Sequence, residues 1–209
     1  FKKNIQSVEI GTHNYCNRTC TFCPLSVEGV NRRNFKNTIF MKDEMYENIM
    51  KQLSEINFAG RLDFSRYHEP TSHKKYILEK IKIAKRYLPS VKISLNTNSD
   101  YINKEYHQQL VEAGVDSFAF QAYMKNGANK FDEDEVFKRI NYITDRLGAP
   151  RIDKEQHRNK EWIIYKLPER FKGKIHARNY WVNGVNRAGT VLDTNYTRTK
   201  PCTSMNKGV

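Results

Sequence analysis

The run YCNRTCTFCP, residues 15–24, holds three of the chain's four cysteines, Cys16, Cys20 and Cys23. Thiolates this close together are typical metal ligands, and three of them can bind three irons of a cubane cluster while the fourth iron stays open. The alternative is one disulfide with one buried thiol, but nothing else in the 209 residues resembles a small disulfide-bonded secreted domain. Zinc would need a fourth ligand, for which His13 is the nearby candidate. We therefore predict an iron–sulfur cluster on this loop.

Strands and helices alternate along the chain, which favours an α/β fold with a parallel sheet. The expected strands are Ser7–Thr12, Arg61–Arg66, Val91–Asn96, Asp116–Tyr123, Trp162–Leu167 and Lys174–Trp181, with a helix as the alternative for Trp162–Leu167. The expected helices are Lys42–Ile56, Tyr76–Leu88, Lys104–Ala113 and Asp134–Leu147. Gly114 and Gly148 are natural stops for the last two helices. About six βα units are too few for a closed eight-stranded barrel, so we predict an open, partial (β/α)6 barrel of the TIM type.

Polar segments follow the expected strands, at the edge where βα folds gather their chemistry. The cysteine loop follows the first strand, YHEP (67–70) follows the second, and NTNSDY (96–101) follows the third. Gln121 ends the fourth strand. Further candidates are His13 and His68, as proton donors or substrate contacts, and Arg178, Asn179 and Tyr180 at the last strand.

The spacing C-x3-C-x-aromatic-C resembles the signature of the radical S-adenosylmethionine (radical SAM) superfamily. The resemblance implies a [4Fe–4S] cluster on Cys16, Cys20 and Cys23, with SAM as the second cofactor. It also implies that Phe22, before the third cysteine, packs near the adenine of SAM. The partial (β/α)6 barrel agrees with this family.

Two further segments are similar to SAM-binding segments of the family. Residues 67–70 resemble a GGEP-type segment, which implies that Glu69 accepts a hydrogen bond from the SAM amino group. Residues 96–101 resemble a Thr-Asn-Gly segment in which Ser99 replaces the glycine. The resemblance thus adds Asn96, Asn98 and Ser99 as contacts of the polar parts of SAM, and Gln121 is a further cofactor-binding candidate.

The end of the chain resembles the start of a C-terminal SPASM or twitch domain. The stretch WVNGVNRAG, residues 181–189, is followed by Cys202, where the resemblance implies the first ligand of an auxiliary iron–sulfur cluster. We therefore expect a radical SAM partial barrel at 1–181 and the start of the extension at 182–209. One cysteine cannot hold a cluster, so either further ligands lie beyond Val209, which we favour, or Cys202 is a hydrogen-atom donor or an inert thiol.

The composition is that of a soluble globular chain, with 38% hydrophobic and 28% charged residues and no long apolar run for a membrane span. Free thiols favour a reducing cytoplasm. The net charge of +13 indicates an anionic partner, or a lysine-rich solvated surface. Nucleic acid is not favoured, because no RNP1-type signature is present.

The resemblance predicts an enzyme that cleaves SAM reductively and abstracts a hydrogen atom from a substrate C–H bond. We expect it to modify a peptide by epimerisation or crosslinking; the alternative is dehydrogenation of an amino sugar or alcohol. A different class stays open, a non-catalytic iron–sulfur or zinc protein that binds nucleic acid through its basic surface. The expected partners of the enzyme are a peptide or anionic small molecule and a reductase or a flavodoxin- or ferredoxin-type electron donor.

Overall fold

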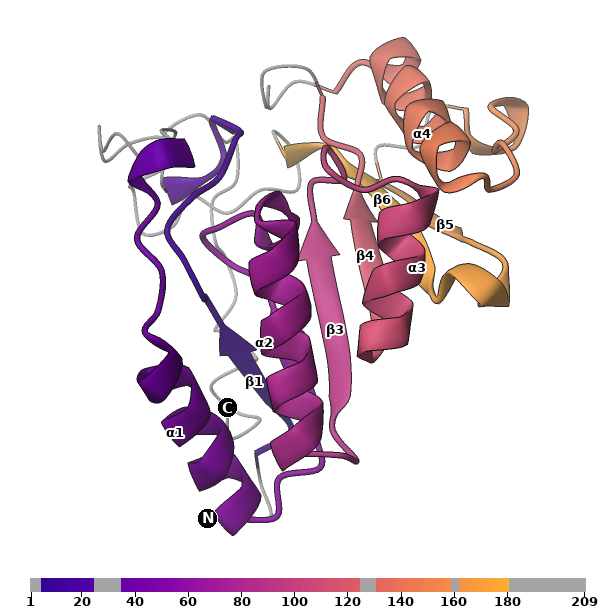
Figure 1. The fold of residues 1–209 in the computed structure, drawn as a ribbon. Helices are drawn as coiled ribbons and strands as arrows, with labels where there is room; N and C mark the ends of the chain where they lie inside the picture. The colour runs from indigo at the N-terminus through magenta and orange to yellow at the C-terminus, as the bar shows by residue number, and fades with distance from the viewer. Residues whose placement is uncertain (1–4, 25–34, 125–130, 159–161, 181–209) are drawn as a thin grey trace, which may run out of the picture.

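A twisted sheet with helices packed against it forms the part of the chain that the structure, a computed structural model, describes: residues 5–24, 35–124, 131–158 and 162–180 (Figure 1). Its strands are β1 (Ser7–Ile10), β2 (Arg61–Phe64), β3 (Lys92–Thr97), β4 (Val115–Gln121), β5 (Trp162–Lys166) and β6 (Gly173–Arg178). Its α-helices are α1 (Asp43–Glu55), α2 (Lys74–Tyr87), α3 (Lys104–Ala113) and α4 (Glu133–Leu147). The predicted α/β class is confirmed.

The strand order is β1-β2-β3-β4-β6-β5, and every pair from β1 to β6 is parallel. The first four strands are neighbours in sequence and in space, as right-handed βα units produce them. Helices α1, α2 and α3 lie side by side in front of these strands, with α2 between the other two (Figure 1). This half of the fold has the architecture that the sequence predicts.

The other half differs from the prediction of six parallel βα units. Strand β5 pairs with β6 in the antiparallel direction and lies at the edge of the sheet. Only residues 167–172 connect them, whereas a parallel crossover needs about a dozen residues or more. A 3-10 turn, Glu169–Phe171, occupies this connection, so the described residues hold four α-helices for six strands. The expected strand end at Trp181 lies outside the described residues.

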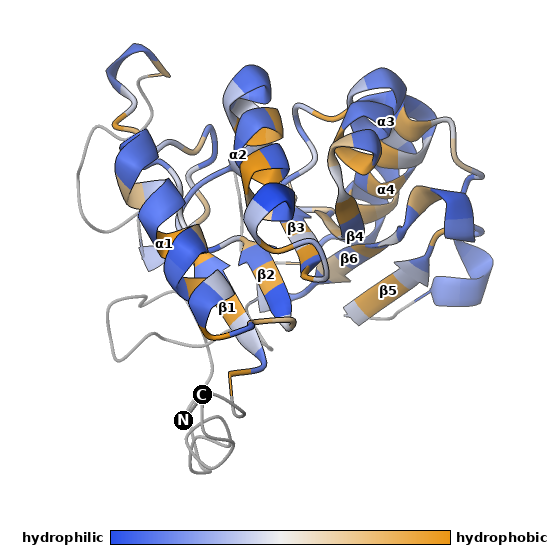
Figure 2. Cartoon of the chain, turned by 60° about the horizontal axis from the view of Figure 1, so that its bottom comes forward, coloured by the Kyte–Doolittle hydropathy of each residue, from blue (hydrophilic) through white to orange (hydrophobic). Residues whose placement is uncertain are grey.

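The two faces of the sheet have different chemistry. Ile93 and Leu95 of β3 and Phe120 of β4 are fully buried in the apolar core. The alternate positions Asn96 and Gln121 carry polar side chains that hydrogen-bond each other at 2.8 Å. Since side chains of a strand alternate between faces, the helices cover the apolar face and the polar residues point the other way. Figure 2 shows the matching apolar side of α2 in orange.

Local signals set the helix ends. The side chains of Asn103 and Asp132 accept hydrogen bonds from the backbone N–H groups of Tyr106 and Glu135, at 2.9 and 2.8 Å, and cap α3 and α4. Gly148 ends α4 with a left-handed backbone (φ 65°), as predicted for this glycine. No helix among the described residues is both long and apolar enough to span a bilayer.

One lysine of α2 is buried, although lysine side chains usually lie on the surface. Lys80 of α2 is fully buried, with its ammonium between the rings of Tyr46 and Tyr76 at 5.1 and 4.9 Å. It donates to the carboxylate of Asp43 at 2.5 Å and so joins α2 to α1. This lysine contributes to the packing of the helix layer rather than to a basic surface.

Candidate active site

The cysteine loop lies at the carboxyl edge of the parallel strands. It leaves β1 directly, and the loops after β2 and β3 end beside it, because the backbone N–H of Glu69 donates to the carbonyl of Tyr15 at 2.8 Å. The side-chain amide of Asn98 donates to Asn17 at 2.8 Å and lies 4.0 Å from the sulfur of Cys16. The structure therefore brings together the three segments that the sequence singled out.

Cys16, Cys20 and Cys23 are all free thiols, so the alternative of a disulfide within the loop is not formed. Burial, followed by the charge of Glu69, raises the pKa of Cys16 to about 12, and burial raises the pKa of Cys20 to about 12. Arg18 acts in the opposite direction on both. Ligation of iron would replace the protons that burial keeps on these sulfurs.

The donor set fits an iron–sulfur cluster better than zinc. Three thiols on one loop can each take a different iron, so their sulfurs need not converge on one point. No group of three or more His, Cys, Asp or Glu side chains in the described part of the chain is arranged to hold one metal ion. His13, the expected fourth zinc ligand, instead packs its ring against His68 at 4.6 Å and His73 at 5.0 Å.

The carboxylate of Glu69 faces the protein interior. It accepts hydrogen bonds from the backbone N–H and the hydroxyl of Thr71, at 3.0 and 2.5 Å, from the hydroxyl of Thr97 at 2.7 Å, and from the backbone N–H of Asn98 at 2.7 Å. Its exposed fraction is 2%. Burial raises the pKa of Glu69, and these hydrogen bonds lower it in part. Glu69 thus connects the loop after β2 to the loop after β3. Its contact with the SAM amino group stays a prediction.

Ser99 has the backbone conformation that a glycine adopts easily. Its φ is 67°, in the left-handed region, and its exposed fraction is 2%. The similarity to a Thr-Asn-Gly segment thus has a structural basis, because the turn after β3 needs a positive φ at this position. Asn98 precedes it with its side chain toward the cysteine loop.

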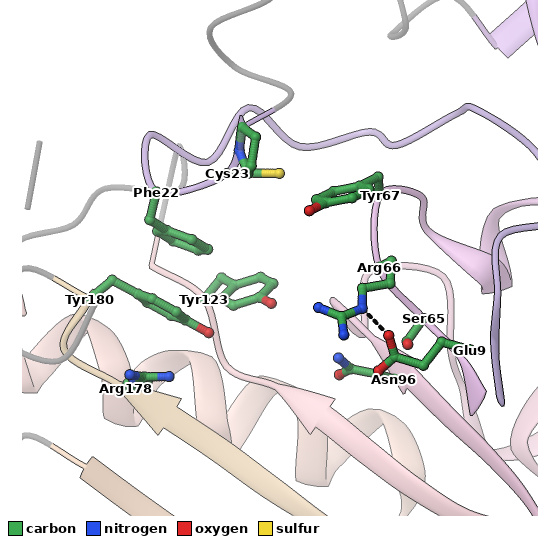
Figure 3. A pocket seen from close by; sticks show the side chains of 11 residues that line it. Glu9, Phe22, Cys23, Ser65, Arg66, Tyr67, Asn96, Tyr123, Arg178 and Tyr180 are labelled. Carbon is green, nitrogen blue, oxygen red and sulfur yellow. Dashed lines mark hydrogen bonds and ion pairs between the residues drawn. The ribbon is translucent and has the colours of Figure 1, made fainter. Parts of the chain in front are cut away.

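A polar pocket of about 250 Å³ opens beside the cysteine loop (Figure 3). Its lining residues at the ends of β1 to β3 are Glu9, Ser65, Arg66, Tyr67 and Asn96. Those from the cysteine loop and the ends of β4 and β6 are Phe22, Cys23, Pro24, Tyr123, Arg178 and Tyr180. The cysteine loop and the charged side chains face each other across this space in Figure 3.

Charge in the pocket comes from three side chains. Glu9 and Arg66 form an ion pair, drawn as a dashed line in Figure 3. Arg66 has a φ of 83°, a strained value for a residue with a side chain, and such strain gathers at functional sites. The guanidinium of Arg178 lies over the rings of Trp162 and Tyr180, at 4.8 and 5.2 Å.

Aromatic rings form the side of the pocket next to Cys23. The rings of Phe22 and Tyr180 are stacked with centroids 3.7 Å apart and an interplanar angle of 7°. Tyr123 lies 5.3 Å from Phe22. Phe22 is therefore in the pocket, as the site prediction requires, and its proximity to adenine stays a prediction.

Some predicted residues lie elsewhere. Gln121 does not line the pocket, but it donates to Asn96, which does. His13 and His68 are buried outside the pocket, where burial lowers their pKa to about 3 and about 4. Cys202 lies outside the described residues. The sequence analysis missed Glu9, Arg66 and Tyr123. Arg66 and Tyr123 are the last residues of predicted strands, and Glu9 lies within one.

Comparison with known proteins agrees with this geometry. The family model of the radical SAM superfamily matches residues 10–122. The S-adenosyl-L-methionine-dependent 2-deoxy-scyllo-inosamine dehydrogenase of Niallia circulans is 34% identical over 116 residues, which are 56% of this chain and 44% of that protein.

Solved structures give the same relationship. The crystal structure of BtrN in complex with AdoMet and 2-DOIA shares 27% identity and a TM-score of 0.51, over 68% of this chain and 54% of that one. The chain thus spans about half the length of the relatives that it matches. These comparisons do not test the SPASM or twitch extension.

Proposed function

Because the chain belongs to the radical SAM superfamily, we propose that it cleaves SAM reductively and dehydrogenates an alcohol of an aminocyclitol or amino sugar. The observation that carries the proposal is the polar pocket, which joins the cysteine loop to Glu9, Arg66 and Arg178. The similarity to a 2-deoxy-scyllo-inosamine dehydrogenase supports this substrate class. It favours the alternative of dehydrogenation over our first expectation, the modification of a peptide.

In this proposal Cys16, Cys20 and Cys23 hold a [4Fe–4S] cluster. When bound, the cluster supplies the electron that splits SAM into methionine and the 5'-deoxyadenosyl radical, which takes a hydrogen atom from the substrate carbon. The aromatic side of the pocket, with Phe22 and Tyr123, then receives the adenine, and Asn98 and Ser99 lie beside the polar parts of SAM. Apolar and aromatic walls around a few polar groups are typical of cofactor pockets.

The charged side chains suit a small polyol that carries an amine. The carboxylate of Glu9 would accept a hydrogen bond from a substrate ammonium or hydroxyl group, once the Arg66 side chain turns away from it. Arg178 offers guanidinium N–H donors to substrate oxygens while two aromatic rings hold it in place. A site that hydrogen-bonds each substrate hydroxyl discriminates strongly against analogues that lack them.

The reaction balances with one electron acceptor. The alcohol carbon loses a hydrogen atom to give 5'-deoxyadenosine, the hydroxyl loses a proton, and the remaining unpaired electron leaves to the acceptor, so that a ketone forms. A second iron–sulfur cluster, with Cys202 as one of its ligands, would be able to accept this electron. The first electron comes from a flavodoxin- or ferredoxin-type donor, whose acidic surface would suit a chain with a net charge of +13.

The proposal is tested anaerobically with the chain reconstituted with iron and sulfide. We expect 5'-deoxyadenosine when 2-deoxy-scyllo-inosamine is supplied with dithionite and SAM, and no product from Cys20→Ala. Substrate with deuterium at the carbinol carbon should transfer that deuterium to 5'-deoxyadenosine, measured by mass spectrometry. A full cluster that forms no 5'-deoxyadenosine would contradict the radical chemistry. Deuterium transfer from a peptide but from no polyol would contradict the substrate class.

A further inference from the structure

The carboxylate of Asp100 is one of the groups that connect the cysteine loop to the rest of the fold. Its Oδ2 accepts from the Asn17 side-chain amide and from Nε of Arg18, both at 2.7 Å. Its Oδ1 accepts from Nη2 of Arg18 at 2.8 Å and from Nη2 of Arg139 at 2.5 Å. Asn17 and Arg18 lie between Cys16 and Cys20, so this carboxylate binds two residues in the middle of the loop.

The two arginines extend this connection to other elements. Nη1 of Arg18 donates to the carbonyl of Met124, after β4, at 3.1 Å. Nη2 of Arg139, on α4, also donates to the carbonyl of Asn98 at 2.7 Å. The cysteine loop, the loop after β3, the end of β4 and the helix α4 therefore meet at Asp100.

The geometry of these contacts makes them strong. The pair of Asp100 and Arg18 is bidentate, which fixes orientation as well as distance. The side chains of Asp100, Arg18 and Arg139 are 21%, 14% and 14% exposed, so water screens their charges only in part.

We propose that Asp100 is a positioning residue that holds the cysteine loop in its cluster-binding conformation. Asp100 hydrogen-bonds Asn17 and Arg18, and it holds the cysteine loop through these two residues. The inference rests on the proposed function, because it requires the loop to hold a cluster. Outer-shell partners of this kind typically change metal affinity about 10–100-fold.

The chain offers a matched control in Asp116, at the opposite end of the sheet. Its carboxylate accepts from Nζ of Lys85 and from the backbone N–H of Ile93, both at 2.9 Å. Its side chain is 29% exposed, close to the 21% of Asp100. Asp100→Asn and Asp116→Asn therefore remove one charge each from similar ion pairs, but only the first lies next to the cysteine loop.

Two measurements separate positioning from stability. The first is the urea midpoint of the apo chain, which we expect to fall by similar amounts in Asp100→Asn and Asp116→Asn. The second is the rate at which an iron chelator removes the reconstituted cluster, followed by its visible absorbance. We expect this rate to rise about tenfold in Asp100→Asn and to stay as in the unmodified chain in Asp116→Asn.

Arg139→Gln is a milder variant that tests the inference even if Asp100→Asn does not fold. It removes the contact of Asp100 with α4 and leaves the pair of Asp100 and Arg18 intact. We expect a rate of cluster loss between those of the unmodified chain and Asp100→Asn. Equal rates in Asp100→Asn and Asp116→Asn would overturn the inference while the proposed function stands. An unmodified chain that takes up no cluster would overturn the proposed function, and the inference with it.

Discussion

The carboxylate of Glu69 accepts a hydrogen bond from the backbone N–H of Asn98 at 2.7 Å. This contact joins the loops that follow β2 and β3, and Asn98 in turn donates to Asn17 in the cysteine loop. A buried carboxylate thus sets the spacing between the three segments that form the candidate active site.

Removal of this carboxylate should lower the stability of the fold. Glu69→Ala leaves two backbone N–H groups, of Thr71 and Asn98, without their acceptor, and we expect a loss of at least about 2 kcal/mol in the free energy of unfolding. Glu69→Gln keeps one acceptor and should lose less. Urea unfolding of the apo chain measures both.

Glu47→Gln is the control for the loss of a carboxylate. Glu47 pairs with Arg86 at 3.2 Å on the surface, so its removal should cost less than about 1 kcal/mol. If Glu69→Ala costs as little as Glu47→Gln, the hydrogen bonds of Glu69 do not stabilise the loops.

The left-handed backbone of Ser99 predicts that glycine at this position gives a more stable fold than valine. In Ser99→Gly the positive φ is no longer strained, but glycine gives the unfolded chain more conformational entropy. The two effects oppose each other, so the stability of this variant should stay within about 1 kcal/mol of the parent. Ser99→Val places a β-branched side chain at the same φ and should cost about 1–2 kcal/mol or more. Thermal unfolding of the two variants provides the comparison, and a valine variant as stable as the glycine one would be inconsistent with a strained turn.

The buried histidines predict a loss of stability in mild acid. Burial keeps the folded pKa of His13 at about 3 and of His68 at about 4, below the ordinary value of 6.5. The unfolded chain therefore takes up protons first as the pH falls below 6.5, and the stability present above that pH is lost. In this window each group contributes up to about 1.4 kcal/mol per pH unit.

Urea unfolding of the apo chain at pH 7 and pH 5 measures this slope. His68→Gln removes one of the groups that take up a proton on unfolding in this pH range, and it should flatten the slope. A slope in His68→Gln equal to that of the parent would assign the pH dependence to other groups.

The stack of Phe22 on Tyr180 predicts an effect on SAM binding. If Phe22 receives adenine, Phe22→Ala should weaken SAM binding by about three- to tenfold, the usual worth of one aromatic contact. Phe40 is an aromatic residue outside the pocket, so the Phe40→Ala variant should bind SAM as the parent does. Equilibrium dialysis with the reconstituted chain gives both affinities, and equal affinities would remove Phe22 from the adenine site.

Much of the fold could be predicted from the sequence because hydrophobic periodicity and stop signals are local. The spacing of Met45, Ile49 and Leu53 indicated α1, and Gly148 marked the end of α4. The direction of β5 could also have been predicted, since residues 167–172 are too short for a parallel crossover.

The site could be predicted only as far as its motifs reach. The cysteine spacing and the strand-end position of residues 67–70 and 96–101 placed these segments at one edge. Contacts that join distant residues, such as Glu9 with Arg66 and Asp100 with Arg139, follow from register and helix position. The inward direction of Glu69 depends on the hydroxyl group of Thr97, which belongs to the Thr-Asn-Gly-like segment, and on that of Thr71, which no motif identifies.

The strand order has a consequence for how the chain acquires its structure during synthesis. Strand β5 is made before β6, yet in the described residues its partner in the sheet is β6, which also pairs with β4. Until β6 emerges, β4 is an open edge with unpaired backbone groups, and β5 has no place in the sheet. The last described strand therefore completes the sheet, and Arg178, at its end, enters the pocket only at that moment.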